Sequence, residues 1–131
     1  MIGRRFLLLS LLLLLAAPIG CIQKKRTSEA VAIATIENLG GSIEPERPSP
    51  GKPVFRVVLT NTRVSDEHLQ YLDAFPALRL LSLAHTEVTD AAIPYLVNLR
   101  NLKRISLVDT QITPQGMRDL RTALPELHIQ R

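Results

Sequence analysis

The chain has 131 residues, of which 46% are hydrophobic and 4% aromatic, and its formal net charge is +4. This length holds one domain, and the lack of tryptophan removes the usual stacking platforms for nucleic acid or sugar. The positive charge belongs to the N-terminal segment, because residues 27–131 hold 11 Lys/Arg against 12 Asp/Glu. The electrostatic footprint of a nucleic-acid-binding protein is therefore missing, and we expect no nucleic-acid partner.

Residues 1–20 have the layout of a secretory signal. Two arginines precede a largely apolar run over residues 6–17. An uncleaved membrane anchor is the alternative, although Pro18 and Gly20 interrupt the run before it reaches the roughly 20 apolar residues of a spanning helix. We therefore expect an exported protein, located at the cell membrane or in the periplasm.

The only cysteine, Cys21, follows this run directly. A lone cysteine cannot form an internal disulfide, so it is either free or modified. Residues 17–21, Ala-Pro-Ile-Gly-Cys, resemble the lipobox of bacterial lipoproteins, whose cysteine is acylated and becomes the new N-terminus after cleavage. Gly20 and Ile19 fit that pattern, whereas Pro18 stands where the family prefers an aliphatic residue. The resemblance implies a lipid anchor on Cys21, and ordinary cleavage that leaves a free thiol is the alternative.

Lys24, Lys25 and Arg26 make residues 21–26 a basic tether. Such a cluster can rest against anionic headgroups, where each basic residue contributes about 1 kcal/mol. It would then add to a single acyl chain, which by itself binds a membrane only marginally. A solvated tether without membrane contact is the other interpretation.

Residues 27–53 are expected to form an N-terminal cap. Apolar residues at helical spacing predict an amphipathic helix, which Gly40-Gly41 would end through a left-handed residue. These apolar residues are Ala32, Ile33, Ile36 and Leu39. Ile43 is expected to begin a short strand beside the first repeat. Four of the nine prolines lie between Pro45 and Pro53, in a turn-rich connector.

From Val54 onward the sequence aligns with itself at a shift of 24 residues. The inward positions of a short strand recur, followed by a threonine, a hydroxyl residue and an apolar position of a short helix. The recurring sets are Val57/Leu81/Ile105, Leu59/Leu83/Leu107, Thr62/Thr86/Thr110, Ser65/Thr89/Thr113 and Leu72/Leu96/Leu120. Each unit is therefore predicted to contain a strand, a turn, a short helix and a return loop.

Each predicted helix starts at a hydroxyl residue suited to cap its N-terminus, namely Ser65, Thr89 and Thr113. The next residue also suits a helix start, as an acid near the positive end of the dipole or as a first-turn proline: Asp66, Asp90 and Pro114. The threonines after the strands stand where the chain turns inward. Their hydroxyls are expected to satisfy backbone groups of the neighbouring coil and to form a ladder through the stack.

The pattern LxxLxLxxTxVTDxxLxxL resembles a bacterial leucine-rich repeat in which threonine replaces the usual asparagine. The resemblance covers residues 54 to about 130. It implies an α/β fold, a short solenoid with parallel strands on the concave face, short helices on the convex face and an N-terminal capping helix. Residues 54–131 hold three full units and a partial fourth, about the minimum for stability, since one unit cannot bury its own apolar face.

The C-terminal segment departs from the period. Residues 124–127 resemble residues 75–78, but the spacing is 49, one more than two periods. A strand is expected to start at His128. Without a cap beyond it, this strand would expose unpaired backbone groups, so a homodimer through the C-terminal edge strand is a hypothesis.

The outward strand positions are the candidate partner-binding residues, because the resemblance implies binding through the concave face. Parallel strands lie about 4.8 Å apart, so these residues would form two rows. One row is Arg56, Leu80 and Arg104, and the other is Val58, Ser82 and Ser106. Two arginines flanking an exposed leucine suit an acidic partner with an apolar centre. An ordinary solvated strand face is the alternative.

A third row at the strand ends holds Asn61, His85 and Asp109. His85 and Asp109 could form a catalytic dyad with Ser82 or Ser106 as nucleophile, but nothing in the sequence supplies an oxyanion hole or a closed pocket. The three histidines occupy different repeat positions, so no shared metal site is expected. We expect no enzyme, no metal and no cofactor.

The sequence thus predicts a membrane-tethered, extracytoplasmic module that binds an unknown protein partner through its concave face. The alternative is a structural or self-associating envelope protein without a dedicated ligand. A hydrolase that uses His85 is a third hypothesis.

Overall fold

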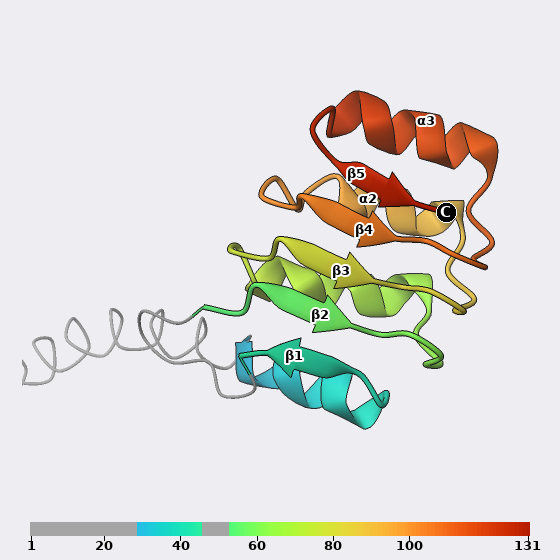
Figure 1. Ribbon diagram of the computed structural model, residues 1–131. Coiled ribbons are helices and arrows are strands. Elements are labelled where there is room, and N and C mark those ends of the chain that lie inside the picture. The colour runs from blue at the N-terminus through green and yellow to red at the C-terminus, as the bar shows by residue number, and fades with distance from the viewer. Residues whose placement is uncertain (1–28, 46–52) are drawn as a thin grey trace, which may run out of the picture.

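The computed structural model describes residues 29–45 and 53–131. The predicted signal segment, Cys21 and the basic tether lie outside these residues, as does most of the proline-rich connector. The described residues form one five-stranded sheet whose strands lie in sequence order, with helices packed against it (Figure 1). The predicted α/β class is confirmed.

The 24-residue period sets the register of the sheet. The strands are β1 (Ser42–Glu44), β2 (Arg56–Val58), β3 (Leu80–Ser82), β4 (Arg104–Ser106) and β5 (His128–Gln130). Strands β2 to β5 are parallel, and each residue pairs with the one 24 positions later, as Val57 does with Leu81. The additional residue seen before Leu127 is therefore absorbed ahead of β5. Strand β1 pairs antiparallel with β2, which places Ile43 opposite Val57.

A helical segment follows each of β2, β3 and β4. These segments are the 3₁₀ helix η1 (Asp66–Ala74), the 3₁₀ turn η2 (Asp90–Ala92) with α2 (Ile93–Leu96), and the α-helix α3 (Pro114–Ala123). In η1 the buried residues are Leu69 and Leu72. Their spacing of three matches the three residues per turn of a 3₁₀ helix, so both face the core.

The expected N-terminal helix is present over residues 29–38. It ends at Gly40, whose φ of +85° is left-handed, and the Gly41 N–H donates to the Ile36 carbonyl at 2.9 Å. This is the Schellman arrangement that the glycine pair predicts. Ala32 and Ile36 of this helix are buried in the core beside the first strands.

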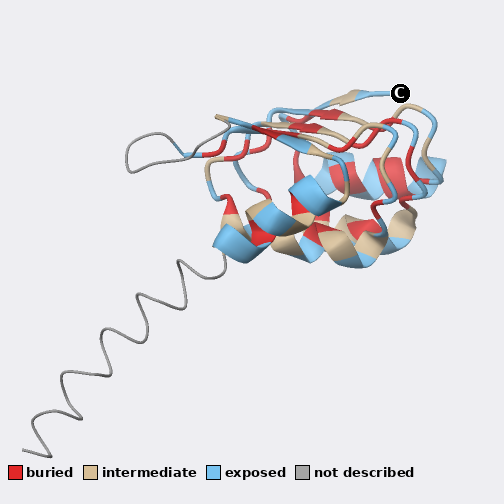
Figure 2. Cartoon of the chain, turned by 90° about the horizontal axis from the view of Figure 1, so that it is seen from below, coloured by how far each residue is buried: buried red, intermediate tan, exposed pale blue. Residues whose placement is uncertain are grey.

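The helices lie together on one side of the sheet, and the buried residues gather between the two layers (Figure 2). Inward strand residues are almost fully buried, with exposed fractions of 0% at Val57, 3% at Leu81 and 0% at Ile105. A fully buried aliphatic side chain contributes about 1.5–3 kcal/mol, so this layer holds the strands and helices together. Within residues 29–45 and 53–131, no helix covers the opposite face of the sheet.

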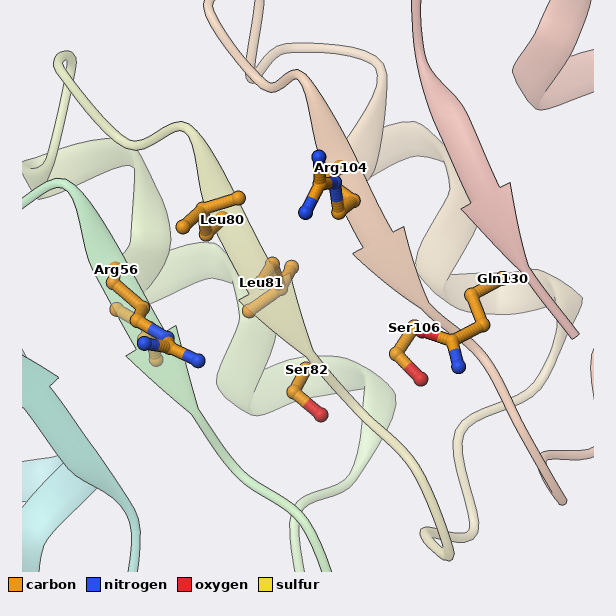
Figure 3. Close-up of a pocket in the computed structure, with 8 residues that line it drawn as sticks. Arg56, Leu80, Leu81, Ser82, Arg104, Ser106 and Gln130 are labelled. Atoms are coloured by element: carbon orange, nitrogen blue, oxygen red, sulfur yellow. The ribbon is translucent and has the colours of Figure 1, made fainter.

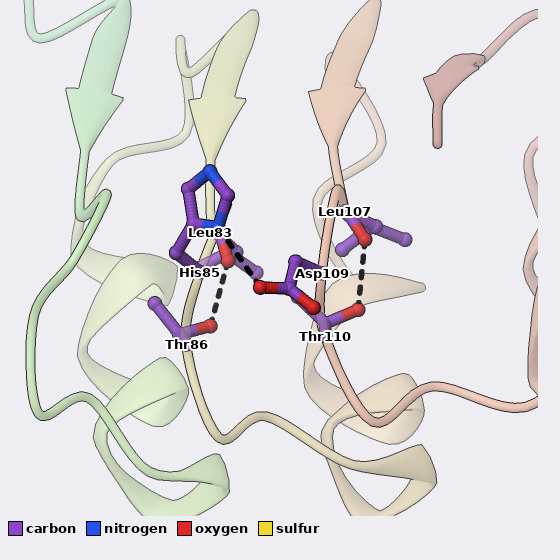
Figure 4. Close-up of polar contacts among 6 residues, drawn as sticks. All are labelled: Leu83, His85, Thr86, Leu107, Asp109 and Thr110. Carbon is purple, nitrogen blue, oxygen red and sulfur yellow. Dashed lines mark hydrogen bonds and ion pairs between the residues drawn. The ribbon is translucent and has the colours of Figure 1, made fainter.

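Strands β2, β3 and β4 are each followed by the same left-handed turn. Its central residues are Asn61, His85 and Asp109, with φ of 58°, 56° and 54°. The threonine that follows donates its hydroxyl to the carbonyl three residues earlier, at 2.6–2.9 Å (Figure 4). These hydroxyls therefore bond their own coil, and the expectation that they bond the neighbouring coil is wrong. The left-handed residue turns the chain back, which brings the hydroxyl to the carbonyl of the same turn.

Carboxylates link successive coils instead. Asp66 accepts the N–H of Thr89 at 2.8 Å and the hydroxyl of Thr89 at 2.6 Å. Asp90 accepts the N–H of Thr113 at 2.8 Å and also the Thr113 hydroxyl. A Cβ at Gly116 would collide with the Asp90 carboxylate, so glycine leaves the room that this contact needs. Both acids thus start a helix, as predicted, and also tie it to the next coil.

The predicted helix caps form in two ways. The Thr89 hydroxyl accepts the Ala91 N–H at 3.3 Å, and the Thr113 hydroxyl accepts the Gly116 N–H at 3.2 Å. At the first helix the contact instead involves His68. The Ser65 N–H donates to His68 Nδ1 at 3.1 Å, which satisfies a backbone donor at the helix start.

Candidate binding face

The outward residues of the five strands form two rows across the open face of the sheet. The charged row contains Glu44, Arg56, Leu80, Arg104 and His128, and the polar row contains Ser42, Val58, Ser82, Ser106 and Gln130. Each member is exposed or half-buried. The strand pairing therefore brings the six candidate residues together in the two rows that the period predicts.

Four members of these rows were missed from the sequence. His128 and Gln130 stand 24 residues after Arg104 and Ser106, so a direct shift would have found them. The 25-residue step from Leu102 to Leu127 obscured that signal. Glu44 and Ser42 belong to β1, which precedes the repeats and runs antiparallel, so no periodic signal identifies them.

A depression of about 270 Å³ lies in the middle of this face (Figure 3). It is lined by Arg56, Val57, Leu80, Leu81, Ser82, Arg104, Ser106 and Gln130. Its volume is just below the range of about 300–1,000 Å³ that is typical of small-molecule pockets. It is also open to solvent. Such a surface suits side chains presented by a macromolecule better than an enclosed substrate.

The two arginines of the charged row differ in their surroundings. Arg56 Nη1 lies 3.5 Å from the Glu44 carboxylate, which partly balances its charge. No ion pair involves Arg104 among the residues that the structure describes. Its neighbour in the row, His128, is exposed. The positive potential of the face is therefore centred on β4.

The polar row also divides into two parts. The hydroxyls of Ser82 and Thr60 are hydrogen-bonded at 2.8 Å. In the described part of the chain, no side-chain hydrogen bond is formed by Ser106 or Gln130. These two residues are direct neighbours across β4 and β5 and both line the depression. They are available to bind a partner next to Arg104.

The third predicted row brings His85 and Asp109 into contact. His85 Nδ1 lies 3.0 Å from Asp109 Oδ2, and the two side chains are 48% and 79% exposed (Figure 4). Exposed pairs of this kind typically contribute about 0–1 kcal/mol. The Ser82 hydroxyl is bonded to Thr60, so the contact seen for His85 links two turns rather than a base and a nucleophile.

Lys103 and Glu126 form another ion pair, beside the start of β4. Lys103 Nζ lies 2.7 Å from Glu126 Oε2. The hydrogen bond from Lys103, together with its positive charge, lowers the pKa of the Glu126 carboxyl. Both side chains are exposed, so this pair balances charge at the surface outside the two rows.

No protein-family model matches this sequence, and a search of curated proteins finds no match. Within residues 29–45 and 53–131, His, Cys, Asp and Glu form no group of three or more that could hold a metal ion. None of the helices in that same part of the chain has the length and apolar character needed to span a membrane.

Proposed function

We propose that this chain is a short leucine-rich repeat protein that binds a protein partner through the open face of its sheet. We further propose that it is exported and held at a membrane by a lipid on Cys21. The single observation that carries the binding role is the constant 24-residue register. It aligns Arg56, Leu80 and Arg104 on a face that no described helix covers.

The repeated geometry supports the repeat class. Each parallel strand is three residues long and is followed by a left-handed residue and a threonine that bonds back to its own coil. Asp66 and Asp90 join one coil to the next. In stacked repeats each unit contacts mainly its neighbours, and such contacts between coils hold the stack together. Binding residues on short, hydrogen-bonded strands are thereby fixed in position.

The open depression supports binding rather than catalysis. Its lining combines two arginines, apolar side chains and hydroxyls without a nucleophile in contact with a base. Protein interfaces favour arginine and a buried apolar centre surrounded by polar groups. Arg104 and Leu80 are adjacent in register and provide these two elements.

The face is tested by blocking it. Ser82→Tyr/Ser106→Tyr places two bulky side chains in the depression, whereas Gln70→Tyr/Arg118→Tyr changes exposed residues of the helical side. Quantitative mass spectrometry of proteins that co-purify from a detergent-solubilised envelope should show a partner lost at least tenfold with the first variant only. Circular dichroism confirms that both variants fold. If the same partners co-purify with both variants, the open face is not the binding site. A structural protein without a ligand would lose no partner in either case.

The anchor is tested by Cys21→Ser. Membrane fractionation should find the wild-type chain with the membranes and the variant in the soluble fraction, because loss of acylation removes the main hydrophobic contact. Retention of the variant in washed membranes would instead indicate an uncleaved apolar anchor.

A further inference from the structure

We infer that the partner segment on this face is an acidic, extended peptide that places a carboxylate at Arg104 and an aliphatic side chain on Leu80. This inference rests on the proposed function, since it names the chemistry of the partner for the same face. It is carried by the unbalanced charge of β4 and by the arrangement of the residues around it.

The charge of the face opposes that of the chain. Residues 27–131 have a net charge of −1, yet the charged row holds two arginines and one glutamate among its described residues. Glu44 is paired with Arg56, so Arg104 is the cation without a counter-charge in the row. A partner that covered Arg104 without an anion would leave a desolvated charge unpaired, which is strongly unfavourable. A partner carboxylate removes that cost.

The neighbours of Arg104 suit a carboxylate on a peptide. Its guanidinium can donate two parallel hydrogen bonds to one carboxylate. Ser106 lies two residues along the same strand, and Gln130 lies beside Ser106 on β5, so hydroxyl and amide groups are available for peptide carbonyls and N–H groups. Leu80 is adjacent to Arg104 across the sheet. Same-side side chains of an extended peptide are about 7 Å apart, within the combined reach of Arg104 and Leu80.

The same observations argue against other anionic ligands. Nucleic acids need several phosphate contacts from Lys and Arg, and single strands also need aromatic platforms. In the two rows, as the structure describes them, Arg104 is the one arginine without an ion pair, and neither row contains an aromatic residue. A lone arginine beside a leucine fits one carboxylate and one aliphatic group.

The test is a titration of the full-length, ¹⁵N-labelled chain in neutral detergent micelles, followed by NMR. The probes are capped nine-residue peptides with the central sequence Glu-Ser-Leu-Ser-Glu, or the same peptide with glutamine or lysine at both glutamates. The acidic peptide should shift the amide signals of Leu80, Arg104 and Ser106 and bind at least tenfold more tightly than the glutamine peptide. Arg104→Gln should abolish that difference. Arg121→Gln, which removes an exposed arginine of α3, should preserve it.

Each other outcome has a distinct meaning. If the glutamine or lysine peptide shifts these signals equally well, the face binds peptides and the proposed function stands, but the inference of an acidic partner is wrong. If inorganic phosphate at the same concentration causes the same shifts, the face binds small anions and the peptide is not its ligand. If no probe shifts the face, the acidic-peptide inference is wrong, while the co-purification experiment judges the proposed function separately.

Discussion

Replacing Gly116 with alanine should have opposite effects on stability with and without Asp90. Gly116 is buried in the first turn of α3, where alanine is intrinsically favoured over glycine by about 0.8–1.0 kcal/mol. In the native protein, however, the new Cβ would collide with the Asp90 carboxylate, which is fixed by the N–H and hydroxyl of Thr113. The substitution therefore sets helix preference against the link between two coils.

The expected magnitudes follow from these contacts. A hydrogen bond to a charged group contributes about 1.5–3 kcal/mol, and the exposure of Thr113 favours the lower end for each bond. Asp90→Ala should therefore lower the free energy of unfolding by about 2–3 kcal/mol. Gly116→Ala alone should lower it by about 1–2 kcal/mol, since the gain in helix preference offsets part of the loss. Added to Asp90→Ala, the same change should stabilise by about 1 kcal/mol.

Urea unfolding of the four proteins measures this double-mutant cycle, with a coupling of about 2–3 kcal/mol expected between the two sites. Asp66→Ala is the matched control, because it removes the equivalent bonds to Thr89 one coil earlier, where Gly116 makes no contact with the carboxylate. Its effect should add to that of Gly116→Ala. Additive effects of Asp90→Ala and Gly116→Ala, or a stabilising Gly116→Ala in the native chain, would refute the coupling.

Three further predictions concern the turns and the surface. Thr86→Val should lower the free energy of unfolding by about 1 kcal/mol, since the buried hydroxyl that donates to the Leu83 carbonyl is lost; a urea midpoint equal to that of the native chain would contradict this. Asp109→Ala should cost about 1–2 kcal/mol in thermal unfolding and Asp109→Gly less, because the residue is left-handed; equal losses would indicate that the carboxylate matters instead. The pKa of Glu126 is lowered in the folded state, so its contribution to stability is present above the unfolded pKa and lost as pH falls through the folded one; Lys103→Met should remove this part of the pH dependence, which urea titrations at acidic pH would detect.

Much of the sheet could be predicted from the sequence because a strict period encodes it. The inward positions around Leu81 and Ile105 recur at 24 residues, and the parallel strands pair at that same step. The alternation of side chains along a strand then assigns Leu80 and Ser82 to the opposite face without further information. The two central rows of the candidate site are thus a direct consequence of the repeat.

The links between coils were not predicted, because they depend on geometry that the period does not contain. Asp66 and Asp90 were interpreted as helix-start residues, and their bonds to Thr89 and Thr113 span 23 residues rather than 24. A search for acid and hydroxyl residues one position short of the period would have indicated these contacts. In the third unit Pro114 replaces the acid, so this link has no equivalent there.

The left-handed turns were also missed, although a signal was present. Asn61, His85 and Asp109 belong to residue types that tolerate positive φ better than most. Their recurrence at one repeat position was interpreted as a row with possible chemistry. The structure assigns them to the turn, where His85 and Asp109 make an exposed contact. Backbone demands therefore explain these polar residues without a catalytic role.

Site-specific photocrosslinking in intact cells tests most directly whether the open face of the sheet is the binding surface. A benzophenone amino acid would replace Ser82 in the depression or, as a control, Gln70 on the exposed side of η1. We predict that one discrete protein adduct forms from position 82, that it is lost with Arg104→Glu, and that it is absent from position 70. Adducts of the same partner from position 70 but not from position 82 would contradict the assignment of the binding surface to this face.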